Sequence, residues 1–217
     1  MKIDGKVLTL YAVTDRTWLR PGEALSEPVE ALLEAGVTCL QLREKEAEDA
    51  VFLEEALILK ELCSRYQVPL IINDRPDIAK KAGADGVHVG LSDMGIEKAR
   101  AFLGGDFIIG GSAHHVPEAL AAWKAGADYI GCGAVFGSST KKDAAVLPFE
   151  ELKAICQAVD IPAVAIGGIH EGNLEKLRGS GIDGVAVISA LFSADDKKAA
   201  ARKLLLLIRD LQKEKYS

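Results

Sequence analysis

Two aspartates that follow short apolar runs, Asp74 and Asp93, have the chemistry needed to hold a divalent cation. Mg²⁺ prefers carboxylate oxygens, and it commonly takes only a few of them from the protein and fills its other positions with phosphate and water. Each aspartate could instead cap the helix that follows it. Because other candidate phosphate ligands surround both positions, we expect them to bind Mg²⁺, with Asn73 as a neighbour that could hydrogen-bond a polar ring.

A second group of residues could bind a multiply charged anion. Gln41 and Arg43 alternate along the end of an apolar run, so their side chains face the same side of a strand. Lys45 follows them, and Lys141 lies in a long segment, 136–146, whose Gly, Ser and Thr content is typical of a mobile loop. A lysine ammonium is a compact charge that suits phosphate. We expect an anion site here, although Lys45 and Lys141 could also be solvated surface residues.

A third group is typical of a phosphate site built from backbone amides. Gly167 and Gly168 precede one expected helix, and Ile188 and Ser189 open another. The N–H groups at two helix N-termini can point at the same anion, and glycine lets its oxygens approach closely. Ser189 adds a hydroxyl donor. The alternative is that the two glycines form only a tight turn.

The histidines favour no hydrolase-like site. His88 lies within a predicted strand, where a hydrogen-bonded core histidine is the favoured interpretation, and His114 and His115 are expected in a loop. No Ser–His–Asp set is evident, so the sequence predicts no nucleophile from the protein.

The elements that must position these residues are short apolar runs that alternate with helical patterns. The runs show no regular polar alternation, which is typical of parallel strands buried on both faces. We expect strands at 7–13, 37–42, 70–72, 86–89, 107–109, 129–131, 163–166 and 184–187. We expect helices at 47–66, 96–103, 117–125, 149–158 and 173–179, where apolar residues recur at helical spacing.

A short Gly-x-Asp pattern, in which an aspartate stands two residues after a glycine, recurs at 82–87, 125–130 and 180–185, with a weaker copy at 35–40. The glycines suit helix C-termini with positive φ, and the aspartates suit turns whose backbone they can bond. Because the pattern precedes every second predicted strand, we expect an α/β protein with a single closed (β/α)8 TIM barrel spanning 1–217 as one domain. An open doubly wound sheet is the alternative. In a barrel, the polar segments that follow the strands share the C-terminal rim, where active sites lie.

The composition argues against several other classes of protein. The 217 residues are 49% hydrophobic and carry a net charge of −6 with no long basic run, which disfavours nucleic acid as a partner. The apolar run 204–208 is too short to cross a membrane, and the first residues lack the apolar stretch of a signal peptide. The four cysteines form no CxxC pair, which favours reduced structural thiols in a cytoplasmic protein.

A set of motifs follows the predicted strands in order, and as a set it is more specific than any single member. The motifs are Thr14-Asp15-Arg16, Gln41-Leu42-Arg43-Glu44-Lys45, Ile72-Asn73-Asp74-Arg75, Asp85-Gly86-Val87-His88-Val89-Gly90, Gly111-Ser112-Ala113-His114, Ser138-Ser139-Thr140-Lys141-Lys142-Asp143, Ala165-Ile166-Gly167-Gly168-Ile169 and Ala186-Val187-Ile188-Ser189-Ala190. Together they resemble the thiamin phosphate synthase family across nearly the whole chain.

The resemblance implies a transferase that joins hydroxymethylpyrimidine diphosphate to hydroxyethylthiazole phosphate and releases pyrophosphate by a dissociative route. It implies that three groups of residues bind the pyrimidine diphosphate, Mg²⁺ and the thiazole phosphate, and that three members of these groups are catalytic. The pyrimidine diphosphate residues are Gln41, Leu42, Arg43, Glu44, Lys45, Asn73, Ser112 and Lys141; the Mg²⁺ ligands are Asp74 and Asp93; the thiazole phosphate residues are Ser138, Ser139, Thr140, Gly168, Ile188 and Ser189; the catalytic residues are Lys45, Ser112 and Lys141.

Three positions depart from the pattern of the family. Its loop usually reads Pro-Thr-x-Thr-Lys, whereas this chain has Gly137 and Ser138 in place of the first two residues, and Leu91 stands where glutamine is usual. The expected partners are the small-molecule substrates, with no nucleic acid and no membrane, and a homo-oligomer stays open. Two other functions also stay open: a thiazole tautomerase-like relative, and a barrel that binds phosphate ligands without turnover.

Overall fold

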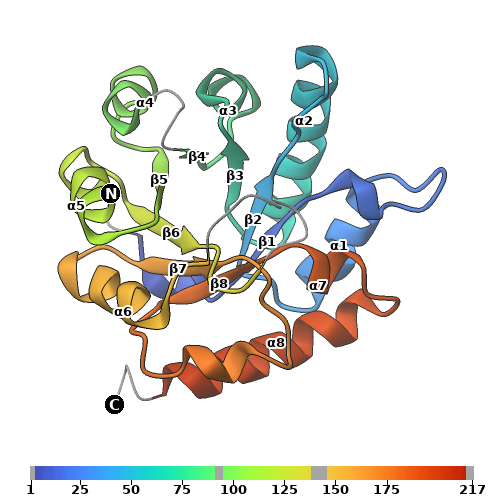
Figure 1. Ribbon diagram of the computed structural model, residues 1–217. Helices are drawn as coiled ribbons and strands as arrows, with labels where there is room; N and C mark the ends of the chain where they lie inside the picture. Colours follow the sequence, from blue (N-terminus) through green and yellow to red (C-terminus); the bar gives the residue numbers. More distant parts are fainter. Residues whose placement is uncertain (1–2, 91–94, 138–145, 214–217) are drawn as a thin grey trace.

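The chain forms a closed barrel of parallel strands surrounded by helices (Figure 1). The structure is a computed structural model that describes residues 3–90, 95–137 and 146–213. Within these ranges the strands pair in chain order and β1 closes on β8, which confirms the predicted barrel over the open sheet. The strands are β1 (Leu10–Val13), β2 (Cys39–Leu42), β3 (Leu70–Asn73), β4 (Gly86–Val89), β5 (Ile108–Ala113), β6 (Tyr129–Gly133), β7 (Ala163–Ile166) and β8 (Gly184–Val187).

Helices follow the strands and cover the outside of the barrel (Figure 1). The α-helices are α1 (Ser26–Glu34), α2 (Asp49–Arg65), α3 (Pro76–Ala82), α4 (Ile96–Leu103), α5 (Val116–Lys124), α6 (Phe149–Ala158), α7 (Ser189–Phe192) and α8 (Lys197–Gln212). Short 3₁₀ helices occur at η1 (Gly5–Leu8), η2 (Arg16–Trp18) and η3 (Leu174–Leu177). None of the helices in the described ranges is long and apolar enough to span a membrane.

Several sequence predictions need correction. The run 7–13 is not one strand, because η1 occupies its first residues and the Asp4 side chain accepts a hydrogen bond from the N–H of Lys6 to begin that turn. The helix expected at 173–179 is only the 3₁₀ turn η3, which lies between Gly172 and Gly179; glycine is a poor helix former. The strands β5 and β6 are each longer than predicted.

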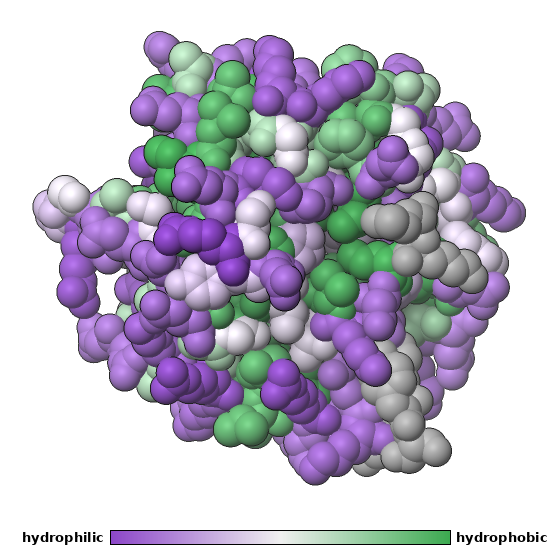
Figure 2. All heavy atoms as spheres, turned by 180° about the vertical axis from the view of Figure 1, so that it is seen from behind, coloured by the Kyte–Doolittle hydropathy of each residue, from purple (hydrophilic) through white to green (hydrophobic). Residues whose placement is uncertain are grey.

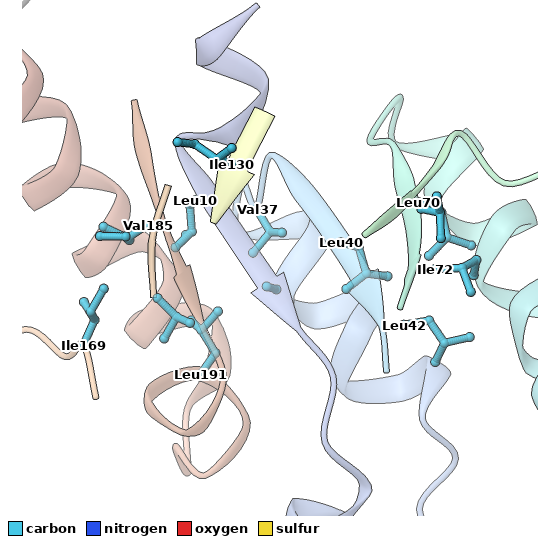
Figure 3. Close-up of a cluster of buried hydrophobic side chains, with 14 of the residues drawn as sticks. Leu10, Val37, Leu40, Leu42, Leu70, Ile72, Ile130, Ile169, Val185 and Leu191 are labelled. Carbon is cyan, nitrogen blue, oxygen red and sulfur yellow. The ribbon is translucent and has the colours of Figure 1, made fainter. Parts of the chain in front are cut away.

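Alternate residues of each strand face the inside and the outside of the barrel. In β1, Leu10 and Ala12 belong to the layer between strands and helices, whereas Tyr11 and Val13 belong to the inner cluster. Figure 3 shows part of the outer layer, with Leu10 and side chains of β2 and β3. The strands are buried on both faces, as predicted for a parallel sheet.

The repeated Gly-x-Asp pattern ties neighbouring strands together at the N-terminal end of the barrel. Its glycines have positive φ, as predicted: +100° at Gly36, +63° at Gly83, +93° at Gly126 and +88° at Gly181. Each side chain two residues later accepts a hydrogen bond from a strand N–H. The four bonds run from Leu10 to Thr38 (2.9 Å), Leu70 to Asp85 (2.8 Å), Ile109 to Asp128 (2.8 Å) and Ala163 to Asp183 (3.0 Å).

The surface is mainly hydrophilic, with small groups of hydrophobic residues between the hydrophilic ones on the face shown in Figure 2. All four cysteines carry free thiols, as expected, and Cys39, Cys63 and Cys132 are buried. Burial raises the pKa of the Cys63 thiol to about 12, which keeps it protonated and unreactive at neutral pH.

Candidate active site

A cavity of about 560 Å³ lies at the C-terminal ends of the barrel strands, within the size range of small-molecule sites. The strand ends and the loops that follow them supply its lining. Among the candidate site residues predicted from the sequence, eight line it: Gln41, Arg43, Asn73, Ser112, Gly167, Gly168, Ile188 and Ser189. The predicted polar rim is therefore one surface, with anion-binding candidates on both sides of it.

One side of the cavity carries the polar residues of β2, β3 and β5. Gln41 and Arg43 both face inward, as their alternation predicts. The neighbouring strand end holds their backbone: the N–H of Thr14 donates to the carbonyl of Gln41 at 2.9 Å, and the Thr14 hydroxyl accepts from the N–H of Arg43 at 2.9 Å. Thr14 is fully buried, so this connection is shielded from water.

The opposite side consists of the loops after β7 and β8. Gly167 and Gly168 have φ of +104° and +65°, and a Cβ on Gly168 would lie 2.3 Å from the carbonyl oxygen of Gly137. The Asn173 side chain donates to the carbonyl of Gly168 at 2.8 Å and holds this loop in place. Because α7 begins at Ser189, its first N–H groups have no intrahelical partner. The second helix N-terminus expected after Gly168 is absent from the described chain, since η3 begins only at Leu174.

Asp74 lies directly after β3 and has a left-handed backbone, with φ of +60°. Its N–H donates to the carbonyl of His88 at 2.8 Å, while its carboxylate accepts from the Asn73 side chain at 2.6 Å and from the N–H of Gly90 at 3.2 Å. It does not cap α3, whose N-terminus has no side-chain cap. The alternative role as a helix cap is therefore excluded for Asp74.

The remaining predicted residues lie elsewhere. The Leu42 side chain is fully buried in the layer between strands and helices (Figure 3). Lys45 is exposed in the loop after β2 and is not part of the cavity lining. The predicted residues that lie outside the described chain are Asp93, Ser138, Ser139, Thr140 and Lys141, together with Leu91.

The Glu44 side chain pairs with Arg16 of the segment after β1 and does not line the cavity. Arg16 donates to Glu44 at 2.9 Å and also pairs with Glu55 of α2. The Glu44 side chain is only 5% exposed. Burial raises the pKa of its carboxyl above the usual glutamate range, although Arg16 acts in the opposite direction.

The cavity floor contains residues that the sequence analysis did not assign to the site. Tyr11 and Tyr129 face each other across the barrel with 2.8 Å between their hydroxyl oxygens. Gln41 donates to Tyr11 at 2.7 Å, and His88 lies between Tyr129 (3.0 Å from Nδ1) and Ser112 (3.1 Å from Nε2). His88 is thus hydrogen-bonded, as expected, but it also lines the cavity. The period of two along β1 and β6 would have placed both tyrosine hydroxyls inside the barrel.

This architecture, with polar residues from several strand ends around one cavity at the C-terminal face, defines a (β/α)8-barrel enzyme. Residues 10–191 match the family model described as thiamine monophosphate synthase, and the chain belongs to that family. It is accordingly a transferase of the thiamine-phosphate synthase kind, which confirms the resemblance inferred from the ordered motifs.

Related proteins match over almost their full length. The thiamine-phosphate synthase of Clostridium acetobutylicum is 49% identical over 200 residues, covering 92% of this chain and 94% of that protein. The one from Caldanaerobacter subterraneus subsp. tengcongensis is 47% identical over 208 residues, covering 95% and 96%. Among solved structures, thiamine phosphate pyrophosphorylase from Pyrococcus furiosus superposes with a TM-score of 0.88 at 38% identity and covers 95% of this chain and 98% of that one.

Proposed function

We propose that this enzyme joins hydroxymethylpyrimidine diphosphate to hydroxyethylthiazole phosphate and releases pyrophosphate. The observation that carries the proposal is the cavity itself: Gln41, Arg43 and Asn73 line one side, and Gly168 and Ser189 line the other. A cavity with anion-binding groups on two sides can hold two phosphorylated substrates next to each other. Such an arrangement supplies the proximity that a two-substrate condensation requires.

The diphosphate is assigned to the side formed by β2 and β3. The Arg43 guanidinium can bind phosphate oxygens in a bidentate manner, and Thr14 holds the backbone from which Arg43 projects. Lys45 follows in the same loop and can add charge, and Lys141 is proposed to join from outside the described chain. Lys45 and Lys141 are accordingly proposed as catalytic residues, since the chemistry depends on stabilising the departing diphosphate. Ser112 is retained as the third proposed catalytic residue, because its hydroxyl lines the cavity and can bind the reacting pyrimidine.

The thiazole phosphate is assigned to the β7 and β8 loops. Glycine at position 168 lets the Gly137 carbonyl pack where a Cβ would otherwise stand, and Ser189 can donate both its N–H and its hydroxyl. Ile188 contributes apolar surface beside the phosphate. Ser138, Ser139 and Thr140 are proposed to complete this side of the site.

The donor set also fits Mg²⁺. Asp74 presents a carboxylate oriented by Asn73 and the Gly90 N–H, which is the type of ligand that Mg²⁺ prefers. Groups of three or more metal-binding side chains are absent from the described residues, but Mg²⁺ bound with a diphosphate needs only one or two carboxylates. We propose Asp74 and Asp93 as its ligands; when bound, the ion would neutralise negative charge on the diphosphate.

A dissociative reaction suits these residues. The bond between the pyrimidine methylene carbon and the diphosphate oxygen breaks first, and the thiazole nitrogen then attacks the resulting cation. The positive charge of Arg43 and Lys45 favours departure of the diphosphate, and the closed floor of the barrel keeps water from the cation. This route requires no nucleophile from the protein.

A pyrophosphate-release assay tests the proposal directly. Purified protein is incubated with both substrates and Mg²⁺, and each of the three is then omitted in turn. Release that requires all three, with thiamin phosphate formed in equal amount, supports the condensation. Isomerisation of the thiazole without pyrophosphate release would favour the tautomerase-like function, and binding of both ligands without turnover would favour a phosphate-binding barrel.

A further inference from the structure

We propose that Tyr11, Tyr129 and His88 are positioning residues that fix the donor and acceptor pattern shown to the pyrimidine by Gln41 and Ser112. These five residues form one hydrogen-bonded chain across the cavity floor. The inference rests on the proposed function for the identity of the ligand, but the direction of the chain follows from the protein alone.

The direction is set at Gln41. Its amide nitrogen lies 2.7 Å from the Tyr11 hydroxyl, and an amide NH₂ can only donate, so the Tyr11 oxygen accepts. The single proton of Tyr11 is then the one available for the 2.8 Å contact with the Tyr129 oxygen. Tyr129 in turn has one proton left, and His88 Nδ1 is the neighbour that can accept it.

This order assigns the tautomer of His88. A ring nitrogen that accepts from Tyr129 carries no proton, so the proton of a neutral imidazole is on Nε2, which lies 3.1 Å from the Ser112 oxygen. His88 therefore donates to Ser112. Burial raises the pKa of both tyrosines well above the usual range, so each hydroxyl keeps its proton.

The two ends of the chain then present opposite groups to a ligand. Ser112 has accepted a hydrogen bond from His88, which leaves its own O–H to donate into the cavity that it lines. Gln41 uses its nitrogen on Tyr11, so its oxygen remains as the acceptor of that amide. A ring with an acceptor nitrogen beside a donor amino group, as in an aminopyrimidine, matches this pair.

Two glycines make room for the chain. Gly110 pairs with Tyr129 in the strand register, and a Cβ at Gly110 would lie 2.2 Å from the Tyr129 ring. A Cβ at Gly131 would lie 3.2 Å from the His88 ring. The barrel interior thus accommodates both rings only because neighbouring strands carry no side chain there.

Nitrogen-15 NMR of the histidine rings tests the direction without any substrate. At about pH 8, above the ordinary histidine pKa, His88 is expected to show a protonated Nε2 and an unprotonated Nδ1. The spectrum of His88→Gln assigns its signals, and the three other histidines serve as internal references. Tyr129→Phe removes the donor and is expected to shift His88 toward the other tautomer. A protonated Nδ1 in the unaltered protein would overturn the proposal.

Kinetics test the consequence for the substrate. Tyr11→Phe and Tyr129→Phe are each expected to raise the KM for the pyrimidine diphosphate about tenfold and to leave the KM for the thiazole phosphate unchanged. Because either change breaks the same chain, the double variant should resemble the single ones. Tyr66→Phe is the matched control, since that hydroxyl contacts only Glu30 and Glu34 among the described residues.

The outcomes separate this inference from the proposed function. If the unaltered protein releases no pyrophosphate but shows the expected His88 tautomer, the function fails and the direction of the chain stands. Multiplicative effects in the double variant, or equal effects on both substrates, would contradict the positioning role even in an active enzyme.

Discussion

The hydroxyl of Thr14 accepts a hydrogen bond from the N–H of Arg43 at 2.9 Å and thereby joins the C-terminal ends of β1 and β2. The same residue donates its own N–H to the carbonyl of Gln41. Two cavity-lining side chains therefore take their positions from a buried threonine that does not itself line the cavity. The threonine of the Thr-Asp-Arg motif after β1 is thus explained by the strand next to it.

Replacement of Thr14 by valine should impair binding of the diphosphate. Valine keeps the shape but leaves the Arg43 N–H without its acceptor, which costs about 1–3 kcal/mol in a buried location. We expect the KM for the pyrimidine diphosphate to rise about tenfold. Steady-state kinetics with each substrate varied separately would measure this, and Thr14→Ser should restore most of the loss. A Thr14→Val enzyme with unchanged KM would exclude the positioning role.

Replacement of Gly168 by valine should mainly weaken binding of the thiazole phosphate. The new Cβ would collide with the Gly137 carbonyl, and φ of +65° disfavours a branched side chain. Gly83→Val is a matched control, because Gly83 has φ of +63° but nothing within 4 Å of its Cβ. Both variants should lose stability. Only Gly168→Val should also raise the KM for the thiazole phosphate, by about tenfold or more, which is the effect expected from the loss of a hydrogen bond to an anion. An equal effect on the diphosphate would contradict the assignment.

Replacement of Asp74 by asparagine should weaken the response to Mg²⁺. Asparagine tolerates the left-handed backbone at this position, so the fold should be retained, but it removes a charged oxygen ligand. We expect the Mg²⁺ concentration for half-maximal activity to increase at least about tenfold. Asp77→Asn changes a neighbouring carboxylate that pairs with Arg75, and it should leave this concentration unchanged. The same Mg²⁺ response in Asp74→Asn and the unaltered enzyme would exclude Asp74 as a ligand.

Glu44 should make the stability of the protein depend on pH in the direction opposite to a normal ion pair. Because burial raises the pKa of its carboxyl, its protonated form is favoured in the folded state. Its contribution to stability is therefore present below the unfolded glutamate pKa of about 4.3 and is lost as the pH rises through the higher folded value. Relative to the unaltered protein, Glu44→Gln should gain unfolding free energy between about pH 4 and pH 7 in urea titrations.

Glu175 provides a control of opposite sign for this measurement. Arg178 lowers the pKa of the Glu175 carboxyl, so that contribution is present above the unfolded pKa and is lost as the pH falls through the lower folded value. Glu175→Gln should accordingly lose relative stability as the pH rises. The same trend in both variants would show that Glu44 does not behave as a buried carboxyl.

The barrel could be predicted because its signals are local and repeated. Gly83 and Asp85 belong to a pattern that marks every second strand, and continuous apolar runs such as β7 mark burial on both faces. The partner of each aspartate could not be predicted, because the N–H that Asp85 binds belongs to Leu70, fifteen residues earlier and on another strand. Only the closed geometry brings them together.

The sequence correctly placed Arg43 and Asn73 in the cavity lining, because each lies at the C-terminal end of a strand with its side chain toward the inside of the barrel. The helix expected after Gly168 was wrong, since nearby glycines reduce it to a 3₁₀ turn. Tyr11 and Tyr129 were not assigned to the site because each stands in an apolar run and resembles a core residue. Their role depends on partners across the barrel, which a linear pattern does not show.

The most direct test of the two-sided cavity is a crystal structure of the protein soaked with thiamin phosphate, pyrophosphate and Mg²⁺. The account predicts the phosphate of thiamin phosphate at the amides of Gly168 and Ser189, and pyrophosphate with the metal ion beside Arg43 and Asp74. Pyrophosphate bound at Gly168, or either anion bound at the N-terminal end of the barrel, would contradict it.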